Sequence, residues 1–439
     1  MKTFRKVLFW LHLIAGIVAG VVILVMSVTG VLLAYERQMV AWADSEYRVV
    51  VPAEAKRLPV EELLAKVKAV ETNAVPSGIT VKADAAAPVT FSFGREKSLL
   101  VDPYSGEVIG EPSKKIREFF HVTTDLHRWL AAEGDYRATG KAITGACNLA
   151  FLFLVVSGLY LWWPKQWTAS ALQAITWFKS GLSGKARDWN WHNVIGFWCC
   201  IPLFFIVLTG SVFSYPWMNN LVYRVTGNEP PPPRTAPVAP GAGPQMAKAG
   251  ESKGEGKRGN GKQVERREGG GPGAARQLYA AGELNAIWTK AEAHATDWQT
   301  ISVRMPSAPD APFAFLVDRG NGARPDKRAT VNLSAKTGEI VSTETYESYN
   351  AGRKLRLWVR WIHTGEAGGF WGQTLAMLAS LGGAVLVYTG FALTCRRWQN
   401  WRNGKNGIAE KADPETAKSV AAQPETAEVL TQSTAKQPS

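Results

Sequence analysis

Four long runs without a charged residue constrain this chain of 439 residues more than any other feature of its sequence. The runs cover residues 7–34, 142–163, 193–223 and 367–395. Each is longer than the roughly 20 residues that a helix needs to cross a hydrocarbon core. The first also exceeds the apolar region of a cleavable signal peptide, which is about 7–15 residues long. The sequence therefore predicts a membrane α-helical fold, a bundle of four transmembrane helices.

Basic residues beside these runs predict the orientation of the chain, whose net charge is +13. They precede the first run, separate the second from the third and follow the fourth: Lys2, Arg5, Lys6, Lys165, Lys179, Lys185, Arg187, Arg396, Arg397, Arg402 and Lys405. By the positive-inside rule, both termini and the middle loop are cytoplasmic. No basic stripe follows a nucleic-acid-binding motif, so we expect membrane lipid and no nucleic acid as a partner.

The predicted order of segments alternates membrane helices with two large outer domains. It is a first transmembrane helix (1–35), an outer domain (36–141), a second helix (142–163), a cytoplasmic loop (164–191), a third helix (192–223), a second outer domain (224–366), a fourth helix (367–395) and a disordered cytoplasmic tail (396–439). Each outer domain has a helical pattern followed by alternating strands, which predicts an α+β structure. Residues 229–276 are rich in Gly, Pro and charge, which predicts a disordered linker.

The two halves of the chain share spacings that indicate an internal duplication. Thr29 follows His12 by 17 residues, as Thr209 follows His192, and a glycine comes next in both. The second and fourth spans share a pair of glycines 18 residues apart, with Ser157 or Thr389 before the second one. We therefore predict two repeated hairpin units of the same topology, related by a pseudo-two-fold axis along the membrane normal.

This repeat makes four of the six histidines equivalent in pairs, His12 with His192 and His127 with His363. A two-fold axis brings each pair together, and two facing imidazoles are the axial ligands of a bis-histidine haem. Small residues near them would leave room for a flat macrocycle: Gly16, Gly20, Gly196 and Gly210. The alternative is that these are ordinary hydrogen-bonded histidines at helix ends.

Two histidines have no equivalent in the other half of the chain. His121 precedes His127 by six residues and could replace it as a ligand. His294 falls in the predicted helix of the second outer domain and is expected to be structural or exposed.

The sequence lacks the motifs of several other kinds of membrane protein and enzyme. The apolar runs hold no carboxylate for proton-coupled transport, and no cluster has zinc-ligand spacing. No phosphate-binding loop, dinucleotide motif or nucleophile elbow is present. The cytoplasmic segments are also too short for a nucleotide-binding domain. An electron-transfer protein of this kind would take its electrons from a quinol or from another protein.

The ordered set of motifs resembles the PepSY-associated transmembrane proteins. The motifs are the His-x-x-x-Gly span that ends in Thr-Gly, Leu-His-Arg-Trp-Leu at 126–130, Asp-Trp-Asn-Trp-His-Asn-Val-Ile-Gly at 188–196 and Ile-His-Thr-Gly-Glu at 362–366. The resemblance covers roughly residues 1–400 without the linker. It implies that the two α+β periplasmic domains are PepSY-like, and that the protein lies in the inner membrane of a Gram-negative bacterium.

Some members of that family resemble ferrisiderophore reductases with two b-type haems. Carried over to this chain, the resemblance implies that His12 and His192 hold a haem b on the cytoplasmic side, and His127 and His363 one on the periplasmic side. The expected activity is reduction of a ferric siderophore during iron acquisition. The alternative is a non-enzymatic protein that modulates a periplasmic peptidase or acts as a scaffold.

A cationic, Trp-rich stretch beside His363 is the candidate substrate site. Its residues are Arg353, Arg356, Trp358, Arg360 and Trp361. They could receive an anionic or aromatic chelate, or form an ordinary interfacial anchor.

Overall fold

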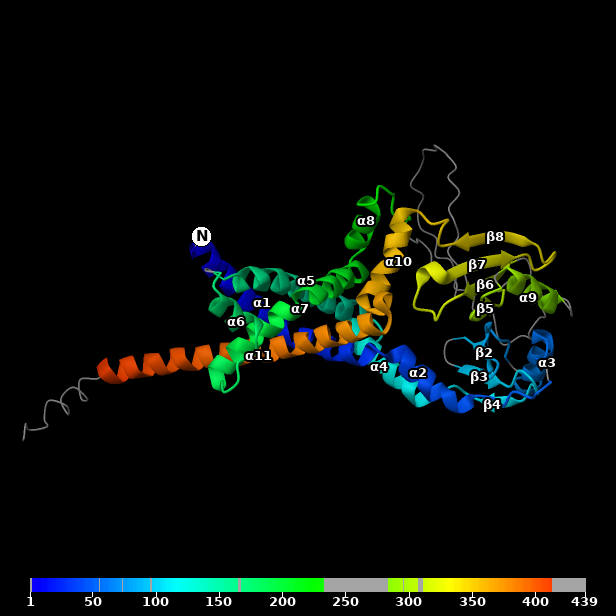
Figure 1. Ribbon diagram of the computed structural model, residues 1–439, viewed down its shortest axis with the longest axis horizontal. Helices are drawn as coiled ribbons and strands as arrows, with labels where there is room; N and C mark the ends of the chain where they lie inside the picture. Colours follow the sequence, from blue (N-terminus) through cyan, green and yellow to red (C-terminus); the bar gives the residue numbers. More distant parts are fainter. Residues whose placement is uncertain are drawn as a thin grey trace, which may run out of the picture.

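The computed structural model describes residues 2–412 except 55, 73, 95–96, 165–166, 233–282, 295 and 307–310. It consists of a helical bundle at one end and a β-sheet with two covering helices at the other (Figure 1). Most of the predicted linker, from residue 233 to 276, lies outside the described residues. We call the two parts the bundle and the sheet. The sheet end of the bundle is the end next to the sheet, and the basic end is the opposite one, where α1 and α7 begin and α11 carries Arg396 and Arg397.

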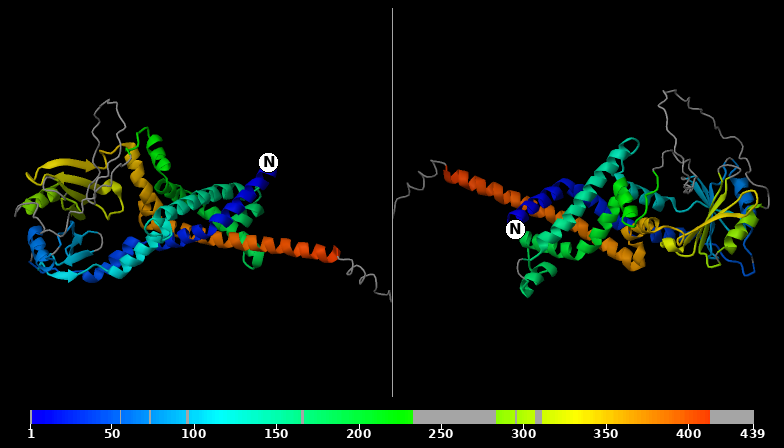
Figure 2. Two further views of the ribbon diagram at one scale, coloured as in Figure 1. Left: turned by 180° about the vertical axis from the view of Figure 1, so that it is seen from behind. Right: turned by 90° about the horizontal axis from the view of Figure 1, so that it is seen from above.

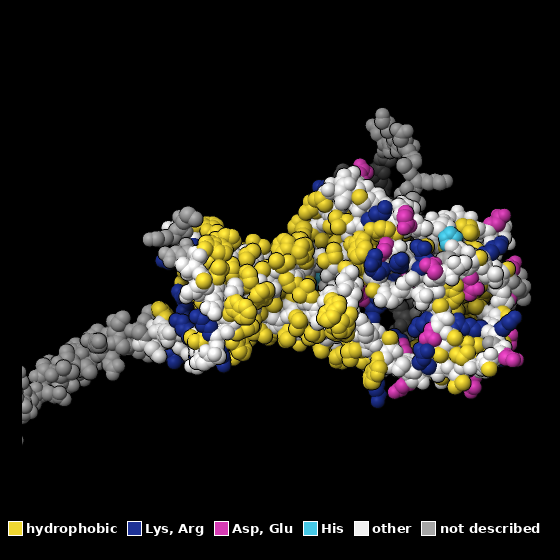
Figure 3. Space-filling model, in the orientation of Figure 1, with side chains coloured by type: hydrophobic (Ala, Val, Ile, Leu, Met, Phe, Trp, Pro, Cys, Tyr) yellow, Lys and Arg dark blue, Asp and Glu magenta, His cyan; other side chains and the backbone are white. Residues whose placement is uncertain are grey.

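The bundle contains the four predicted membrane helices. They are α1 (Lys2–Leu33), α5 (Tyr136–Trp162), α7 (Gly184–Ser214) and α11 (Gly369–Ala412). Among the described residues, these four are long and apolar enough to cross a membrane. Helices α1 and α7 each pack against both α5 and α11. Hydrophobic side chains cover most of the bundle surface, and charged ones gather at its two ends and on the sheet (Figure 3). The chain is a membrane protein.

The predicted third span, residues 193–223, is wrong at both ends. Helix α7 ends at Ser214, and Pro216 begins a separate helix, α8 (Pro216–Arg224). Proline has no backbone N–H and disfavours the helical conformation in the residue before it, and Tyr215 is extended, so α7 ends here although it accommodates Pro202 in its interior. At its start, α7 extends back to Gly184, because charged residues end a charge-free run without ending a helix, and the buried Asp188 of this first part forms ion pairs with two arginines.

The basic end of the bundle also differs from the prediction. The tail was expected to be disordered from residue 396, but α11 continues as a helix to Ala412. The residues after Cys395 are polar without being helix breakers, and polarity ends a membrane span without ending a helix. Residues 413–439 lie outside the described part of the chain. A short helix, α6 (Ala169–Thr176), occupies the predicted loop, and Thr168 caps its first turn.

The two predicted α+β segments join in a single eight-stranded antiparallel sheet. Its strands are β1 (Gly78–Lys82), β2 (Val89–Phe93), β3 (Lys97–Val101), β4 (Val108–Gly110), β5 (Thr300–Arg304), β6 (Phe313–Asp318), β7 (Arg328–Leu333) and β8 (Ile340–Thr345). They lie in the order β4-β3-β2-β1-β5-β6-β7-β8. The seam is the antiparallel pair β1–β5, with Thr80 opposite Ser302. The prediction of two separate outer domains is therefore corrected to one continuous sheet.

The core of the sheet is shared by both halves of the chain. Helices α3 (Val60–Val70) and α9 (Glu283–Ala293) cover the face turned away from the bundle (Figures 1 and 2). Buried side chains of both halves form one cluster beneath them, including Leu63, Ile79, Phe91, Ile301 and Phe315. The period-two burial of β1 and β5 matches this arrangement, since alternate residues face the helices.

Two helices lead from opposite edges of the sheet back to the bundle. After the edge strand β4 comes α4 (Lys114–Trp129), which packs on α1 and α5. After the other edge strand β8 comes α10 (Ala351–His363), which packs on α7 and α8. A short 3-10 helix, η3 (Glu366–Gly368), connects α10 to α11. Both halves thus have the same order of elements, a helix, four strands, a helix and a membrane helix.

Replacing Ile301 by Ala tests whether the sheet unfolds as one unit. Ile301 is fully buried at the seam opposite Val81, so we expect a loss of about 2–5 kcal/mol of stability. Amide hydrogen exchange, followed by mass spectrometry on the full chain, should accelerate in β2 as well as in β6. The control is Leu316→Ala, whose side chain is 38% exposed on the other face. Acceleration confined to β6 would contradict a shared core.

Candidate functional site

The structure brings His127 and His363 together at the sheet end of the bundle. His127 lies near the end of α4 and His363 is the last residue of α10. Their ring centroids are 6.3 Å apart. A metal ion bonded at about 2.0–2.1 Å to one nitrogen of each of two opposed imidazoles would separate the ring centroids by about 6 Å. The spacing of the two rings, whose planes are inclined by 62°, is close to what one metal ion between them needs.

His12 of α1 and His192 of α7 line a common cavity inside the bundle. Its volume is about 1520 Å³, larger than the roughly 300–1,000 Å³ typical of small-molecule sites. Six glycines from all four membrane helices form part of its wall: Gly16, Gly20, Gly158, Gly196, Gly383 and Gly390. Of the four glycines expected to make room, three line this cavity and Gly210 lies at the other histidine pair.

The basic end of this cavity carries four cationic side chains. They are Arg5, Lys6, Lys185 and Arg397, and no Asp or Glu of the described chain lines the cavity. Arg5 donates to two backbone carbonyls, and Arg397 lies over the rings of Phe9 and Trp10. Cations at one end of an apolar cavity suit a flat, apolar ligand with carboxylates along one edge, because guanidinium and ammonium groups form strong hydrogen bonds with carboxylates. A haem with its two propionates has this distribution of charge.

Each of the four histidines has its Nδ1 atom next to a buried hydroxyl group of a membrane helix. The distances are 2.8 Å from His12 to Ser157 Oγ, 2.9 Å from His192 to Thr389 Oγ1, 2.9 Å from His127 to Thr29 Oγ1 and 3.2 Å from His363 to Thr209 Oγ1. In every case Nδ1 is engaged by the protein. Nε2 is the nitrogen left for a metal.

The residue after each hydroxyl is a glycine that makes room for the imidazole. A Cβ atom would lie 3.3 Å from the ring carbon Cε1 at Gly158, 3.7 Å at Gly390, 3.8 Å at Gly30 and 3.4 Å at Gly210. From the sequence, Gly210 is the one member of these four dipeptides that we predict near a histidine, and the other seven residues serve only as marks of the repeat or are not singled out. Their repetition in all four spans was the signal that could have found them.

The two histidine pairs lie near opposite ends of the bundle. Thr29, which contacts His127, follows His12 by 17 residues, a rise of about 25 Å along α1. A hydrocarbon core is about 30 Å thick. The pairs therefore lie close to the two surfaces of the membrane that the bundle crosses.

Burial disfavours the charged forms of His127 and His363. It lowers the pKa of His127 to about 4, and the neighbouring His363 acts in the same direction. The pKa of His363 is lowered as well, again chiefly by burial. A neutral imidazole has the lone pair that a metal requires.

The two remaining histidines stand apart from these pairs. The side chain of His121 is 76% exposed and lies 3.7 Å from Asp125. His294 is exposed beyond the end of α9. His127, and not His121, is thus the residue of α4 that faces His363.

Most residues of the candidate substrate stretch have partners within the protein. Arg353 pairs with Glu344 at 2.9 Å, Arg356 donates to Asn219 at 2.6 Å and Trp358 donates to Tyr346 at 2.8 Å. These contacts hold the three side chains against the protein itself, and both the chelate site and the interfacial anchor stay predictions.

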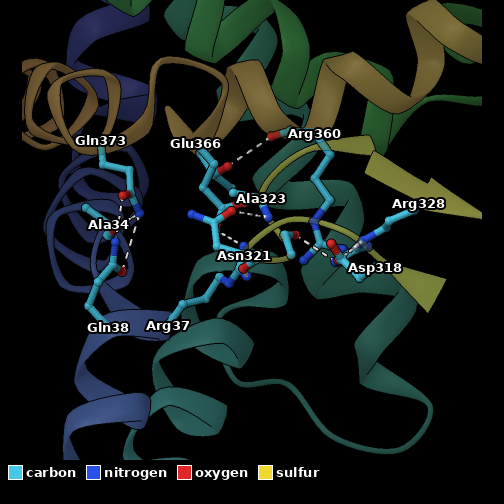
Figure 4. A network of polar contacts seen from close by, with 12 residues as sticks. Ala34, Arg37, Gln38, Asp318, Asn321, Ala323, Arg328, Arg360, Glu366 and Gln373 are labelled. Carbon is cyan, nitrogen blue, oxygen red and sulfur yellow. Dashed lines mark hydrogen bonds and ion pairs between the residues drawn. The ribbon is translucent and has the colours of Figure 1, made fainter. Parts of the chain in front are cut away.

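Arg360 belongs to a polar junction between the sheet and the bundle (Figure 4), and Trp361 follows it in α10. Trp361 is buried, and the guanidinium groups of Arg328 and Arg360 lie 5.4 and 4.8 Å from its ring. Burial and neighbouring arginines lower the pKa of Arg360, which Glu366 partly offsets. Arg37 of α2 (Glu36–Ala43) connects the two parts, because it bonds both Glu366 and the backbone of Asn321, beyond β6.

The fold and these contacts define a four-helix membrane protein with one histidine pair near each end of its bundle. The family model for the PepSY-associated TM region matches residues 9–397, so the chain belongs to this family. No curated protein matched the sequence.

Replacing Asp188 by Asn tests how the basic end of the site is held. Asp188 is 1% exposed, lies one turn before His192 and pairs with Arg187 at 2.9 Å and Arg396 at 3.2 Å. Losing its charge leaves both arginines without this partner, so we expect thermal unfolding in detergent to show a loss of about 1–3 kcal/mol. The control is Asp326→Asn, a surface pair with Arg324, expected to change stability by under about 0.5 kcal/mol. Equal effects would contradict this role.

Proposed function

We propose that the protein is a haem-containing electron-transfer protein of a bacterial inner membrane that reduces ferric siderophores in the periplasm. The observation that carries the proposal is the pairing of His127 with His363, 6.3 Å apart and drawn from different halves of the chain. The proposed orientation places both termini and the basic end of the bundle in the cytoplasm, as the flanking Lys and Arg residues favour. The sheet is then periplasmic, and each of its halves is a PepSY-like unit of the internal repeat.

Two b-type haems fit the residues that the structure presents. His12 and His192 would hold one in the large cavity, where Arg5, Lys6, Lys185 and Arg397 suit its propionates. His127 and His363 would hold the other. Bound haem would supply one-electron redox chemistry at both membrane surfaces. The protein's own part is to present the Nε2 atoms, exclude water with apolar walls and provide the cationic edge.

The position of the outer pair supports a periplasmic substrate. His363 follows Arg360 of the arginine-rich junction by three residues in the last turn of α10, and these cations would favour an anionic ferric chelate. Reduction of Fe(III) to Fe(II) weakens binding by hard oxygen ligands, so the iron is released and the chelator survives. The electron donor is a quinol or a cytoplasmic reductase.

The absorption spectrum of the purified full chain tests this proposal. A dithionite-reduced difference spectrum should show b-type bands from about two haems per chain. His127→Ala and His363→Ala should each remove one spectral component, and His12→Ala and His192→Ala the other, because each pair shares one iron. Anaerobic reduction of a ferric siderophore by the prereduced protein should then fail in all four variants.

His121→Ala and His294→Ala are the matched controls, since both side chains are exposed, and they should retain both components. A colourless protein that takes up no added haem would contradict the proposal. That result would favour a peptidase-modulating or scaffold role.

A further inference from the structure

The four buried hydroxyls next to the histidines already donate their protons along their own helices. Their acceptors are backbone carbonyls of the preceding turn, Val25 for Thr29 at 2.7 Å, Phe205 for Thr209 at 2.6 Å, Val385 for Thr389 at 2.8 Å and Leu154 for Ser157 at 3.4 Å. A hydroxyl has one proton to donate. A hydroxyl that gives its proton to its own helix can only accept a hydrogen bond from the imidazole.

These contacts favour Nδ1–H as the donor to the hydroxyl oxygen, with the lone pair on Nε2. At His363 the shorter contact of Nδ1, 2.8 Å, is to the backbone carbonyl of Ile206, which can only accept, and the hydroxyl of Thr209 at 3.2 Å is its second neighbour. The Nδ1–H tautomer at all four imidazoles is the arrangement that agrees with every one of these contacts.

We infer that Thr29, Ser157, Thr209 and Thr389 are positioning residues that hold the four histidines in the Nδ1–H tautomer and set the strength of each as an axial ligand. This inference rests on the proposed function. An acceptor at Nδ1–H fixes the ring and makes the opposite nitrogen more basic, which stabilises the oxidised metal. Hydroxyls that already donate elsewhere are weaker acceptors than carboxylates. They orient the ring without drawing its proton away.

The glycine after each hydroxyl completes the unit. At Gly158 a Cβ atom would lie 3.3 Å from the imidazole, closer than ordinary contact, and at Gly210 it would lie 3.1 Å from Asn148 Oδ1. At Gly30 and Gly390 the ring is 3.8 and 3.7 Å away, so the glycine packs against it at ordinary contact distance. The Ser/Thr-Gly dipeptide thus lies against an imidazole in all four spans.

The contact between Thr29 and His127 also joins α1 to α4. A purely structural role of Thr29 therefore predicts reduced stability of the protein when its hydroxyl is removed. A positioning role predicts in addition a shift of redox potential at one centre only. The experiment is a spectroscopic redox titration of the purified full chain, comparing Thr29→Val and Ser157→Ala with the unaltered protein.

Thr29→Val should raise the midpoint potential of the component that His127→Ala removes and leave the other unchanged. Ser157→Ala should do the same for the component that His12→Ala removes. Haem retention at the altered centre should fall by about 10–100-fold. Thr29→Ser, which keeps the hydroxyl, should restore both the potential and the retention.

The matched control is Thr123→Val. Thr123 is buried on α4, one turn before His127, and its hydroxyl donates to the carbonyl of Phe119 at 2.8 Å. It should leave both potentials unchanged. A shift equal to that of Thr29→Val would show a general packing effect and overturn the inference.

The remaining outcomes are also decisive. Two haems with unaltered potentials in Thr29→Val and Ser157→Ala would overturn the inference and leave the proposed function standing. If Thr29→Val loses its outer haem altogether, the Thr29→Ser variant is decisive. A native midpoint potential in Thr29→Ser supports the inference, and loss of the haem from Thr29→Ser as well contradicts it. Absence of haem from the unaltered protein is a failure of the proposed function itself.

Discussion

The pairing of β1 with β5 is the interaction on which the rest of the structure depends. It joins the two halves of the chain outside the membrane and places their last strands, β4 and β8, at opposite edges of one sheet. From those edges α4 and α10 return to the bundle and converge, which brings His127 to His363. A sheet divided at the seam would leave these two helices free to separate. The spacing of the outer pair is thus fixed partly by hydrogen bonds far from it.

The sequence predicted the features that follow from local composition. The four charge-free runs are membrane helices, and the alternating segments are strands. The predicted pairing of His127 with His363 is also seen, because equivalent positions in two copies can meet around an axis. Their proposed role as haem ligands stays a prediction. The β1–β5 seam could not be predicted, since both strands have the same alternating pattern whether they pair with each other or stay apart.

Two other features needed the three-dimensional arrangement. Tyr215 and Pro216 lie in an apolar run, so hydropathy extends a span through them, whereas the extended backbone of Tyr215 ends α7 before Pro216. The sequence alone does not distinguish this proline from Pro202, which lies inside the same helix. The partners of the imidazoles are also invisible in the sequence, because Thr29 and His127 are 98 residues apart. The spacing of the Ser/Thr-Gly dipeptides shows that they are equivalent in the two halves, but it does not show which side chains they contact.

Each histidine pair takes one residue from each half of the chain, while the hydroxyl and glycine that hold a histidine come from its own half. A protein encoded by one half alone would carry two correctly held imidazoles and no complete pair. Two such copies would restore both pairs only as a dimer around a two-fold axis. Joining the halves in one chain makes that encounter independent of concentration. It also lets the two ends diverge, since each residue of a pair can then change without its counterpart.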